Sequence, residues 1–486
     1  MSLLTKKPLT ALMADAEATP LRRVLGPVHL TMLGVGAIIG SGIFVLTGVV
    51  AAQNAGPALV LSMIFAGIAC AFAGLCYAEF ASMIPVAGSA YTYAYATLGE
   101  IFAWIIGWDL ILEYSLSAST VAVGWSGLVV SLLNDFGLSP SPQLTAATGT
   151  SIALADGGAV TALVNIPAVF VVVAVTALLV VGIRESAGAN AVIVLVKVLV
   201  LLLFIGFGAA YVQPDNWRPF IPENTGTFGE FGWSGILRGA GIIFFAYIGF
   251  DAVSTAAQEA RNPQRDLPIG ILASLAVCTV LFIATALVLT GIIPYTRLNV
   301  PAPVALAVDE TGLGWLRPLI KLGAIAGLSS VILVLLMAQP RIFMAMSRDG
   351  LLPPVFSRIH SRFRTPALTT ILTGVVVAIA AGLLPIDVLS QLVAMGTLLA
   401  FAIVCAAVLV LRHTSPELAR PFRTPGSPWV PLAGVASCLY LMAGLPLATW
   451  ERLVLWLAIG LAIYFVYSRS RAARVRREAN RVEAAA

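Results

Sequence analysis

The feature that most constrains the fold of this chain is a series of apolar runs, each long enough to cross a membrane. A membrane-crossing helix needs about 20 mostly apolar residues, because the hydrocarbon layer is about 30 Å deep. Only 10% of the 486 residues are charged, against about 25% in soluble domains. We therefore predict an all-α integral membrane protein with twelve transmembrane helices, near residues 28–51, 57–80, 101–133, 163–183, 189–212, 235–257, 268–291, 315–346, 366–384, 388–411, 429–449 and 452–468.

The positions of the basic residues predict how these spans are oriented. An even number of spans places both termini on one side, and most of the 28 Lys and Arg residues then fall in segments on that side. Because basic loops stay in the cytoplasm, we expect both termini to be cytoplasmic. The net charge of +5 follows from this bias, so no nucleic-acid partner is predicted. The basic tail, 469–486, is expected to act as a stop signal or to contact anionic membrane lipid.

No sequence pattern typical of an enzyme or a metal site is present. The five cysteines lie in apolar runs, where they are expected to be small buried hydrophobic residues. The three histidines lie at or beyond the ends of spans. No Ser-His-Asp arrangement, metal-ligand spacing or phosphate-binding loop occurs. We therefore predict no catalytic residue, no metal and no cofactor.

Two spans carry glycine-rich interruptions in matching places. The first span contains GVGAIIGSGI, with Gly40 and Gly42, and the sixth contains FFAYIGFD, with Gly249. Glycine weakens a helix by about 1 kcal/mol relative to alanine, and hydrocarbon offers no water to loosened backbone groups. Interrupted helices in corresponding positions of two halves indicate a transporter binding site. Close packing between helices is the alternative explanation for such glycines.

The spacing of the two interruptions predicts the domain organisation. Five spans separate the two elements, an odd number, so the second half must be inverted in the membrane relative to the first. We expect two five-span repeats, 28–212 and 235–412, joined by an extracellular loop at 213–234. The other expected segments are a cytoplasmic N-terminal stretch at 1–27, a loop with two peripheral spans at 413–468, and the tail at 469–486.

An interrupted membrane helix offers binding groups of both polarities. Unwinding frees backbone N–H groups on one half-helix, where the positive end of the dipole favours an anion. It frees carbonyl groups on the other half, which suit a cation. A pair of such breaks therefore fits a zwitterion, and an α-amino acid is a ligand of that kind.

Longer stretches of the sequence resemble a known family. GAIIGSGIF, FFAYIGFDAVSTAAQEARNPQRDLPIGI and QPRIFMAMSRDGLLP resemble the amino acid–polyamine–organocation superfamily, and most closely its cationic amino acid transporter branch in bacterial form. IPVAGSAYTYAYATLGE, at 84–100, is similar to the segment between the second and third spans of that family. The resemblance covers 28–412 and implies a five-plus-five inverted repeat of the leucine-transporter type, with helices 1 and 6 broken.

The resemblance also implies a substrate site at the two breaks. The backbone N–H groups of Ser41 and Gly42, with Ile43 nearby, are expected to bind the substrate carboxylate. The Ser41 side chain could assist or could cap the half-helix. The ammonium group is expected at backbone carbonyls, and Phe245 is also expected to cover the substrate from outside. These carbonyls belong to Ile38, Phe245, Ala246 and Ile248.

Ionisable residues within spans indicate function by default. Lys197 lies in NAVIVLVKVLVLLLF of the fifth span. In proton-coupled relatives of this fold, a lysine at that place substitutes for a bound cation, so we expect Lys197 to couple protons and transport to be sodium-independent. Snorkelling to the interface is the alternative. Asp109, Glu113 and Ser117 share one helical face, and the resemblance places Glu113 at the substrate vestibule.

Other charged residues are expected to support the breaks and the inner gate. Asp251 follows the sixth-span break and is expected to cap or orient the unwound backbone, beside Gly40 and Gly249. Glu79, Glu259 and Arg261 lie at cytoplasmic span ends, where they form either a gate network or surface ion pairs. Pro340 stands where the family has a small polar residue, which predicts a kink in the eighth span.

The sequence predicts the class of protein, an amino acid transporter, more specifically than it predicts the substrate. The resemblance places Leu328 in the eighth-span part of the side-chain subsite, and that part carries no acid to pair with a cationic side chain. We therefore expect small neutral or hydrophobic L-amino acids, with cationic amino acids second. The predicted activity is proton-coupled uptake by alternating access. The alternatives are an exchanger of amino acids or polyamines on the same fold, and a transport-like amino acid sensor.

Overall fold

The computed structural model describes residues 4–8, 24–84, 86, 89–153, 158–182, 187–363 and 365–485. Most of the predicted N-terminal segment, 1–27, therefore lies outside the described residues. The described chain is almost entirely helical, as expected from its apolar runs. One small antiparallel hairpin, β1 (Ser151–Ala153) and β2 (Ala159–Thr161), was not predicted. It lies in the loop after the third span, where short polar residues interrupt the apolar pattern.

The first half of the chain contains both broken and continuous helices. Its α-helices are α2 (Pro27–Ile38), α3 (Thr47–Val50), α4 (Leu59–Met83), α5 (Ser89–Thr97), α6 (Glu100–Asp135), α7 (Ile166–Val181) and α8 (Ala187–Gly208).

The second half repeats this alternation of short and long helices. Its α-helices are α9 (Gly232–Ile243), α10 (Ala252–Thr255), α11 (Pro263–Ile292), α12 (Pro303–Glu310), α13 (Leu316–Arg348), α14 (Ala367–Leu383), α15 (Ile386–Thr414), α16 (Trp429–Gly444), α17 (Leu447–Ile463) and α18 (Arg469–Ala485).

The described helices agree with the predicted apolar runs. Eight continuous helical stretches are long and apolar enough to cross a membrane, and four shorter apolar helices, α2, α7, α14 and α16, fall within other predicted spans. The third and eighth predicted spans are long, as expected: α6 has 36 residues and α13 has 33. α13 continues as a helix through Pro340, so the proline does not end it. The count of twelve spans stays a prediction.

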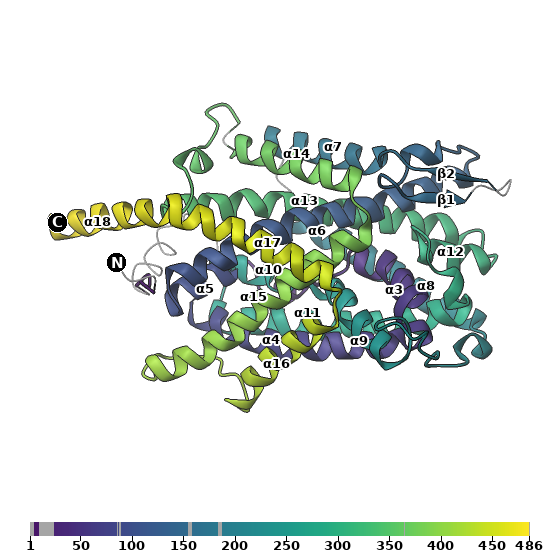
Figure 1. The fold of residues 1–486 in the computed structure, drawn as a ribbon, viewed down its shortest axis with the longest axis horizontal. Helices are drawn as coiled ribbons and strands as arrows, with labels where there is room; N and C mark the ends of the chain where they lie inside the picture. The colour runs from purple at the N-terminus through teal and green to yellow at the C-terminus, as the bar shows by residue number, and fades with distance from the viewer. Residues whose placement is uncertain are drawn as a thin grey trace.

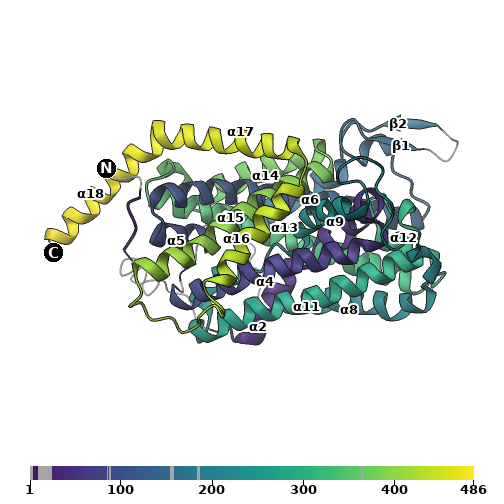
Figure 2. The same ribbon diagram turned by 60° about the horizontal axis from the view of Figure 1, so that its bottom comes forward.

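The helices form an elongated bundle with both termini at one end (Figure 1). We call this the terminal end; the hairpin and α12 lie at the opposite end. α17 runs along the outside of the bundle, and α2, α4, α8 and α11 lie together on another side (Figure 2).

α6 and α13 pack against each other over most of their length, and a few contacts fix their register. Trp125 donates a hydrogen bond to Ser329 Oγ at 2.9 Å. Near the terminal end, a side chain at Gly107 would come within 2.9 Å of Met346. As residue numbers increase along α6, those of the contacting residues on α13 decrease, so the two helices are antiparallel. This register determines which polar groups of the two helices lie at the same level.

Candidate functional site

The first predicted span is interrupted where its glycines cluster. α2 ends at Ile38, and Ile39 has an extended backbone, with φ −73° and ψ 94°. Helical structure resumes at Ser41 and continues as a π-helical turn from Gly42 to Leu46. The break therefore falls at Ile39 and Gly40. The last carbonyl groups of α2 have no N–H donor within the helix and need other hydrogen-bond partners.

The sixth predicted span is interrupted in the corresponding place. α9 ends at Ile243 and is followed by a 3₁₀ turn, Phe244–Tyr247. Ile248 is extended, and Gly249 has φ +121°, a conformation that side chains other than glycine rarely adopt. The chain becomes helical again at α10, Ala252–Thr255.

The two breaks lie directly against each other. A Cβ atom added to Gly42 would overlap the backbone and side chain of Ala246. In the reverse direction, a Cβ added to Gly249 would come within 2.9 Å of Ala37. Gly40 has no such crowding, since its nearest neighbour would be 3.9 Å away. Gly42 and Gly249 therefore permit close packing between the breaks, whereas Gly40 is free of that constraint.

Lys197 connects α8 to the end of α2. Its Nζ donates hydrogen bonds to the carbonyl oxygens of Gly36, at 2.8 Å, and Ile39, at 3.3 Å. The side chain is 0% exposed, and a Cβ at Gly327 of α13 would come within 2.7 Å of its stem. Lys197 therefore does not snorkel to an interface: it places its ammonium group on carbonyls at the carboxyl end of α2, where a positive charge is favoured.

The second half of the first span has apolar neighbours and one orphan hydroxyl. Ser41 is buried, its side chain makes no capping hydrogen bond, and its Oγ has no partner among the described residues. The predicted capping role of Ser41 is therefore wrong for this structure. A Cβ at Gly124 of α6 would lie 3.1 Å from the Ser41 side chain and 3.9 Å from that of Leu328. The remaining predicted site residues here, Ile38, Ile43, Phe245, Ala246 and Ile248, are all buried.

A group of buried polar side chains without partners lies on α6 and its neighbours. Both oxygens of Asp109 and Oε1 of Glu113 have no hydrogen-bond partner among the described residues, and each side chain is almost fully buried. The Asp109 carboxyl packs on Gly396 of α15. The α6–α13 register places Gln339 level with Glu113. We call this set the orphan polar group; its members are Asp109, Glu113, Ser117, Gln339 and Thr397.

Buried polar groups without partners are uncommon, because each costs about 1–3 kcal/mol of lost hydration. Groups of this kind are available to a polar ligand or to water.

The predicted gate residues do not form one network. Glu79 pairs with Arg412 at 2.6 Å and with Arg420 at 3.5 Å, rather than with Arg261. Arg261 donates from Nε to the carbonyl of Val24 at 3.1 Å. The sequence did not indicate this division, because the arginines that reach Glu79 come from the end of α15 and the loop after it.

The backbones of Glu259 and Asp251 make hydrogen bonds that the sequence did not predict. The carbonyl of Glu259 accepts from the N–H of Leu25 at 2.9 Å, so the chain before α2 is tied to the chain after α10. Asp251 precedes α10, but its side chain makes no capping hydrogen bond there. The Asp251 side chain therefore does not cap α10, and its role in orienting the unwound backbone stays a prediction. The backbone carbonyl of Asp251 accepts from the N–H of Ser254 at 2.9 Å.

The terminal end contains a cluster that the sequence did not reveal. Glu100, at the start of α6, accepts from Tyr464 at 2.9 Å and pairs with Arg476 of α18 at 2.8 Å. Asp349, after α13, pairs with Lys7 at 3.1 Å and accepts from Tyr91 of α5 at 2.7 Å. Some of these partners are hundreds of residues apart in the sequence, so no local sequence pattern predicts that they pair.

The described residues contain no group of three His, Cys, Asp or Glu side chains that could hold a metal ion. All five cysteines are free and buried, as predicted.

Apolar spans, paired helix breaks and a buried lysine on helix-end carbonyls are together typical of an integral membrane transporter. Residues 25–466 match the model of the amino acid permease family, and the chain belongs to that family.

Its relatives differ in what their names say they transport. The chain is 49% identical over 468 residues to a methylthioribose transporter of Bacillus subtilis (strain 168), and 47% identical over 470 residues to a branched-chain amino acid permease of the same organism. Each match covers 96% of this chain and 98% of the relative. A vacuolar cationic amino acid transporter 4 of Arabidopsis thaliana is 41% identical over 398 residues, which is 82% of this chain and 64% of that relative.

Proposed function

We propose that this protein takes up L-amino acids by proton-coupled, sodium-independent secondary transport. We also propose the membrane organisation predicted from the sequence: twelve spans, two inverted five-span repeats and cytoplasmic termini in a bacterial inner membrane. The single observation that carries the proposal is the contact of two broken helices beside Lys197. In this arrangement the ends of four half-helices converge near mid-span, where N–H and carbonyl groups are available to one zwitterion.

The proposed substrate site uses both breaks. The carboxylate lies at the N–H groups of Ser41 and Gly42, which begin the second half of the first span. The Ser41 hydroxyl, which has no partner among the described residues, donates to it. The ammonium group lies at the carbonyls on the other side of the break and in the 3₁₀ turn after α9, with Phe245 as its cover. Ile38, Ala246 and Ile248 supply the remaining backbone contacts.

The proposed coupling group is Lys197. In the protonated form its ammonium group donates to the carbonyls of Gly36 and Ile39. When Lys197 releases its proton to water, the neutral amine has one N–H donor fewer. It also loses the positive charge that interacts favourably with the carboxyl end of α2. The first break is then held less firmly, which couples proton loss to movement of α2.

The proposal is tested with purified protein in liposomes. Wild-type uptake of leucine is expected to follow an imposed proton gradient, inside alkaline, and to be unchanged when sodium replaces potassium. Lys197→Gln, which keeps donors but cannot titrate, is expected to exchange internal for external leucine while losing gradient-driven accumulation. Uptake by Lys197→Gln that still follows the gradient would falsify the coupling role. If the wild type instead exchanges leucine at a rate that does not depend on the proton gradient, the result supports the alternative of an amino acid exchanger.

Hydrophobic L-amino acids are the proposed substrates, because the walls beside the breaks are apolar: Ile43, Phe245, Leu328 and Val331 are all buried there. This choice agrees with the name of the branched-chain amino acid permease relative.

The orphan polar group favours a second candidate. Unpaired carboxyl, amide and hydroxyl groups suit a substrate with several hydroxyls, which is the kind of molecule that the methylthioribose-transporting relative is named for. A thermal-shift comparison of leucine, arginine and methylthioribose separates the candidates. Stabilisation by leucine alone supports the first, stabilisation by methylthioribose alone supports the second, and stabilisation by arginine contradicts both.

A further inference from the structure

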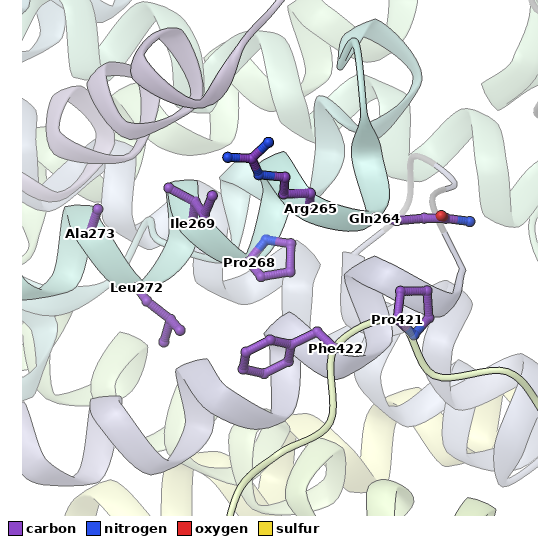
Figure 3. A pocket seen from close by; sticks show the side chains of 8 residues that line it. All are labelled: Gln264, Arg265, Pro268, Ile269, Leu272, Ala273, Pro421 and Phe422. Carbon is purple, nitrogen blue, oxygen red and sulfur yellow. The ribbon is translucent and has the colours of Figure 1, made fainter.

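An open groove lies at the terminal end of the bundle, away from the breaks. It is formed by the first three turns of α11 and by Pro421 and Phe422 of the loop that follows α15, and it has a volume of about 610 Å³. Figure 3 shows Phe422 beside Pro268, Leu272 extending toward the same space, and Arg265 with Gln264 nearer the start of the helix.

The groove exists because the loop is fastened to a different helix. The N–H of Phe422 donates to Ser82 Oγ of α4 at 3.2 Å, and the N–H of Thr424 donates to Glu79 Oε2 at 2.8 Å. Arg412 also holds Glu79, at 2.6 Å. The loop is therefore braced on α4 and stands off α11. A preformed groove of this kind costs a ligand little ordering on binding.

The chemistry of the groove is amphipathic. Its walls are mostly apolar, formed by Pro268, Ile269, Leu272, Ala273 and Phe422. Arg265, at its polar end, is exposed, and its side chain makes no ion pair or hydrogen bond with the described residues. A fitting ligand therefore carries an anionic group beside Arg265 and an apolar chain along the walls.

The apolar walls continue into the surface that faces lipid. Ile269, Val277 and Val280 are 39%, 42% and 68% exposed, and with Ala273 they are spaced three or four residues apart, so they share one face of α11. A chain that leaves the groove along this face stays in the hydrocarbon layer. This continuity favours a membrane lipid over a soluble anion.

We propose that the groove between α11 and Phe422 binds an anionic phospholipid, with its phosphate at Arg265 and one acyl chain against Ile269, Leu272 and Ala273. One basic side chain near a membrane surface contributes about 1 kcal/mol of attraction for an anionic headgroup. The headgroup contact is therefore worth about a fivefold difference in affinity.

The experiment measures lipid retention by native mass spectrometry of the full-length protein in detergent. Phosphatidylglycerol is compared with phosphatidylcholine and with inorganic phosphate. The wild type is expected to retain phosphatidylglycerol about fivefold better than phosphatidylcholine, and to retain no phosphate. Arg265→Gln is expected to abolish the difference between the two lipids. Ala273→Trp, which fills the groove from its open side, is expected to release both.

Two matched controls use sites outside the groove. Arg358→Gln removes another basic side chain of the terminal end, and Val454→Trp adds bulk to an exposed face of α17. Both are expected to retain phosphatidylglycerol as the wild type does. The proposal fails if the two lipids are retained equally by the wild type, if phosphate alone binds, or if the controls lose lipid as much as the groove variants do.

Discussion

At the scale of single residues, the two glycines of the first break have different tasks. Gly42 lies against Ala246, whereas the nearest atoms to a Cβ added at Gly40 would be those of Val331, at an ordinary contact distance of 3.9 Å. Loss of function in a Gly42 variant therefore reports on packing between the breaks as well as on ligand binding. Gly40 and Ser41 are the positions where a substitution can report on the ligand alone.

Gly42→Ala is expected to destabilise the protein by about 1–3 kcal/mol, because the added methyl group overpacks the contact with Ala246. Gly40→Ala is the matched control and is expected to change stability by less than about 1 kcal/mol. Thermal unfolding in detergent compares the two. A Gly42→Ala protein as stable as the control would contradict the contact between the breaks.

Ser41→Ala is expected to weaken amino acid binding roughly tenfold, because a hydrogen bond to a charged group is worth about 1.5–3 kcal/mol. Stability of the ligand-free protein should not fall, since Ser41 Oγ has no partner to lose in the described part of the chain. Isothermal titration and thermal unfolding of the same samples separate the two effects. Unchanged affinity would remove Ser41 from the proposed carboxylate site.

At the scale of elements, α5 lies between the two clusters that fasten the chain ends. Its Tyr95 hydroxyl is 3.3 Å from Glu100, which also pairs with Arg476 of α18. Its Tyr91 donates to Asp349, which pairs with Lys7. Burial, and next the charge of Asp349, raise the pKa of Tyr91, so this phenol stays a donor well above neutral pH.

Arg476→Gln is expected to release α18 from α6, because Glu100 keeps Tyr464 as a donor but loses its ion pair. Limited trypsin digestion should then cut within 469–477 several times faster than in the wild type. Arg474→Gln, on the same helix, is the control and should leave the digestion rate near that of the wild type. Equal protection of both variants would show that α18 is held by packing against Gly350 instead.

At the scale of the whole molecule, the proposed membrane orientation places the two ends of the bundle on opposite sides of the membrane, with the terminal end in the cytoplasm. The five native cysteines are buried, so single cysteines can be introduced as reporters. Thr225→Cys is expected to react with a membrane-impermeant maleimide added to whole cells. Ser361→Cys, near the terminal end, is expected to react only after the cells are opened. The same labelling for both positions would contradict the proposed orientation.

The sequence predicted the long membrane helices but not the shorter elements outside them, and the difference has a physical reason. Long apolar runs predicted α6 and α13, because hydrocarbon forces helices on any such run. α18 lies in a polar segment, the hairpin lies in a loop, and α12 has only 8 residues, so none of the three belongs to an apolar run long enough to cross a membrane. The pairing of Glu79 with Arg412 joins distant segments, and the sequence contains no signal for it.

The sequence by itself determined that this chain crosses a membrane, that its first and sixth spans are weak in matching places, and that Lys197 is an isolated cation in an apolar run. These properties follow from composition and local backbone preference. Only the tertiary structure decided which groups meet: Gly42 with Ala246, Lys197 with the carbonyls of Gly36 and Ile39, and the orphan polar group beside α6. Such contacts depend on how helices cross and in which register they pack, and many registers are compatible with the same apolar pattern.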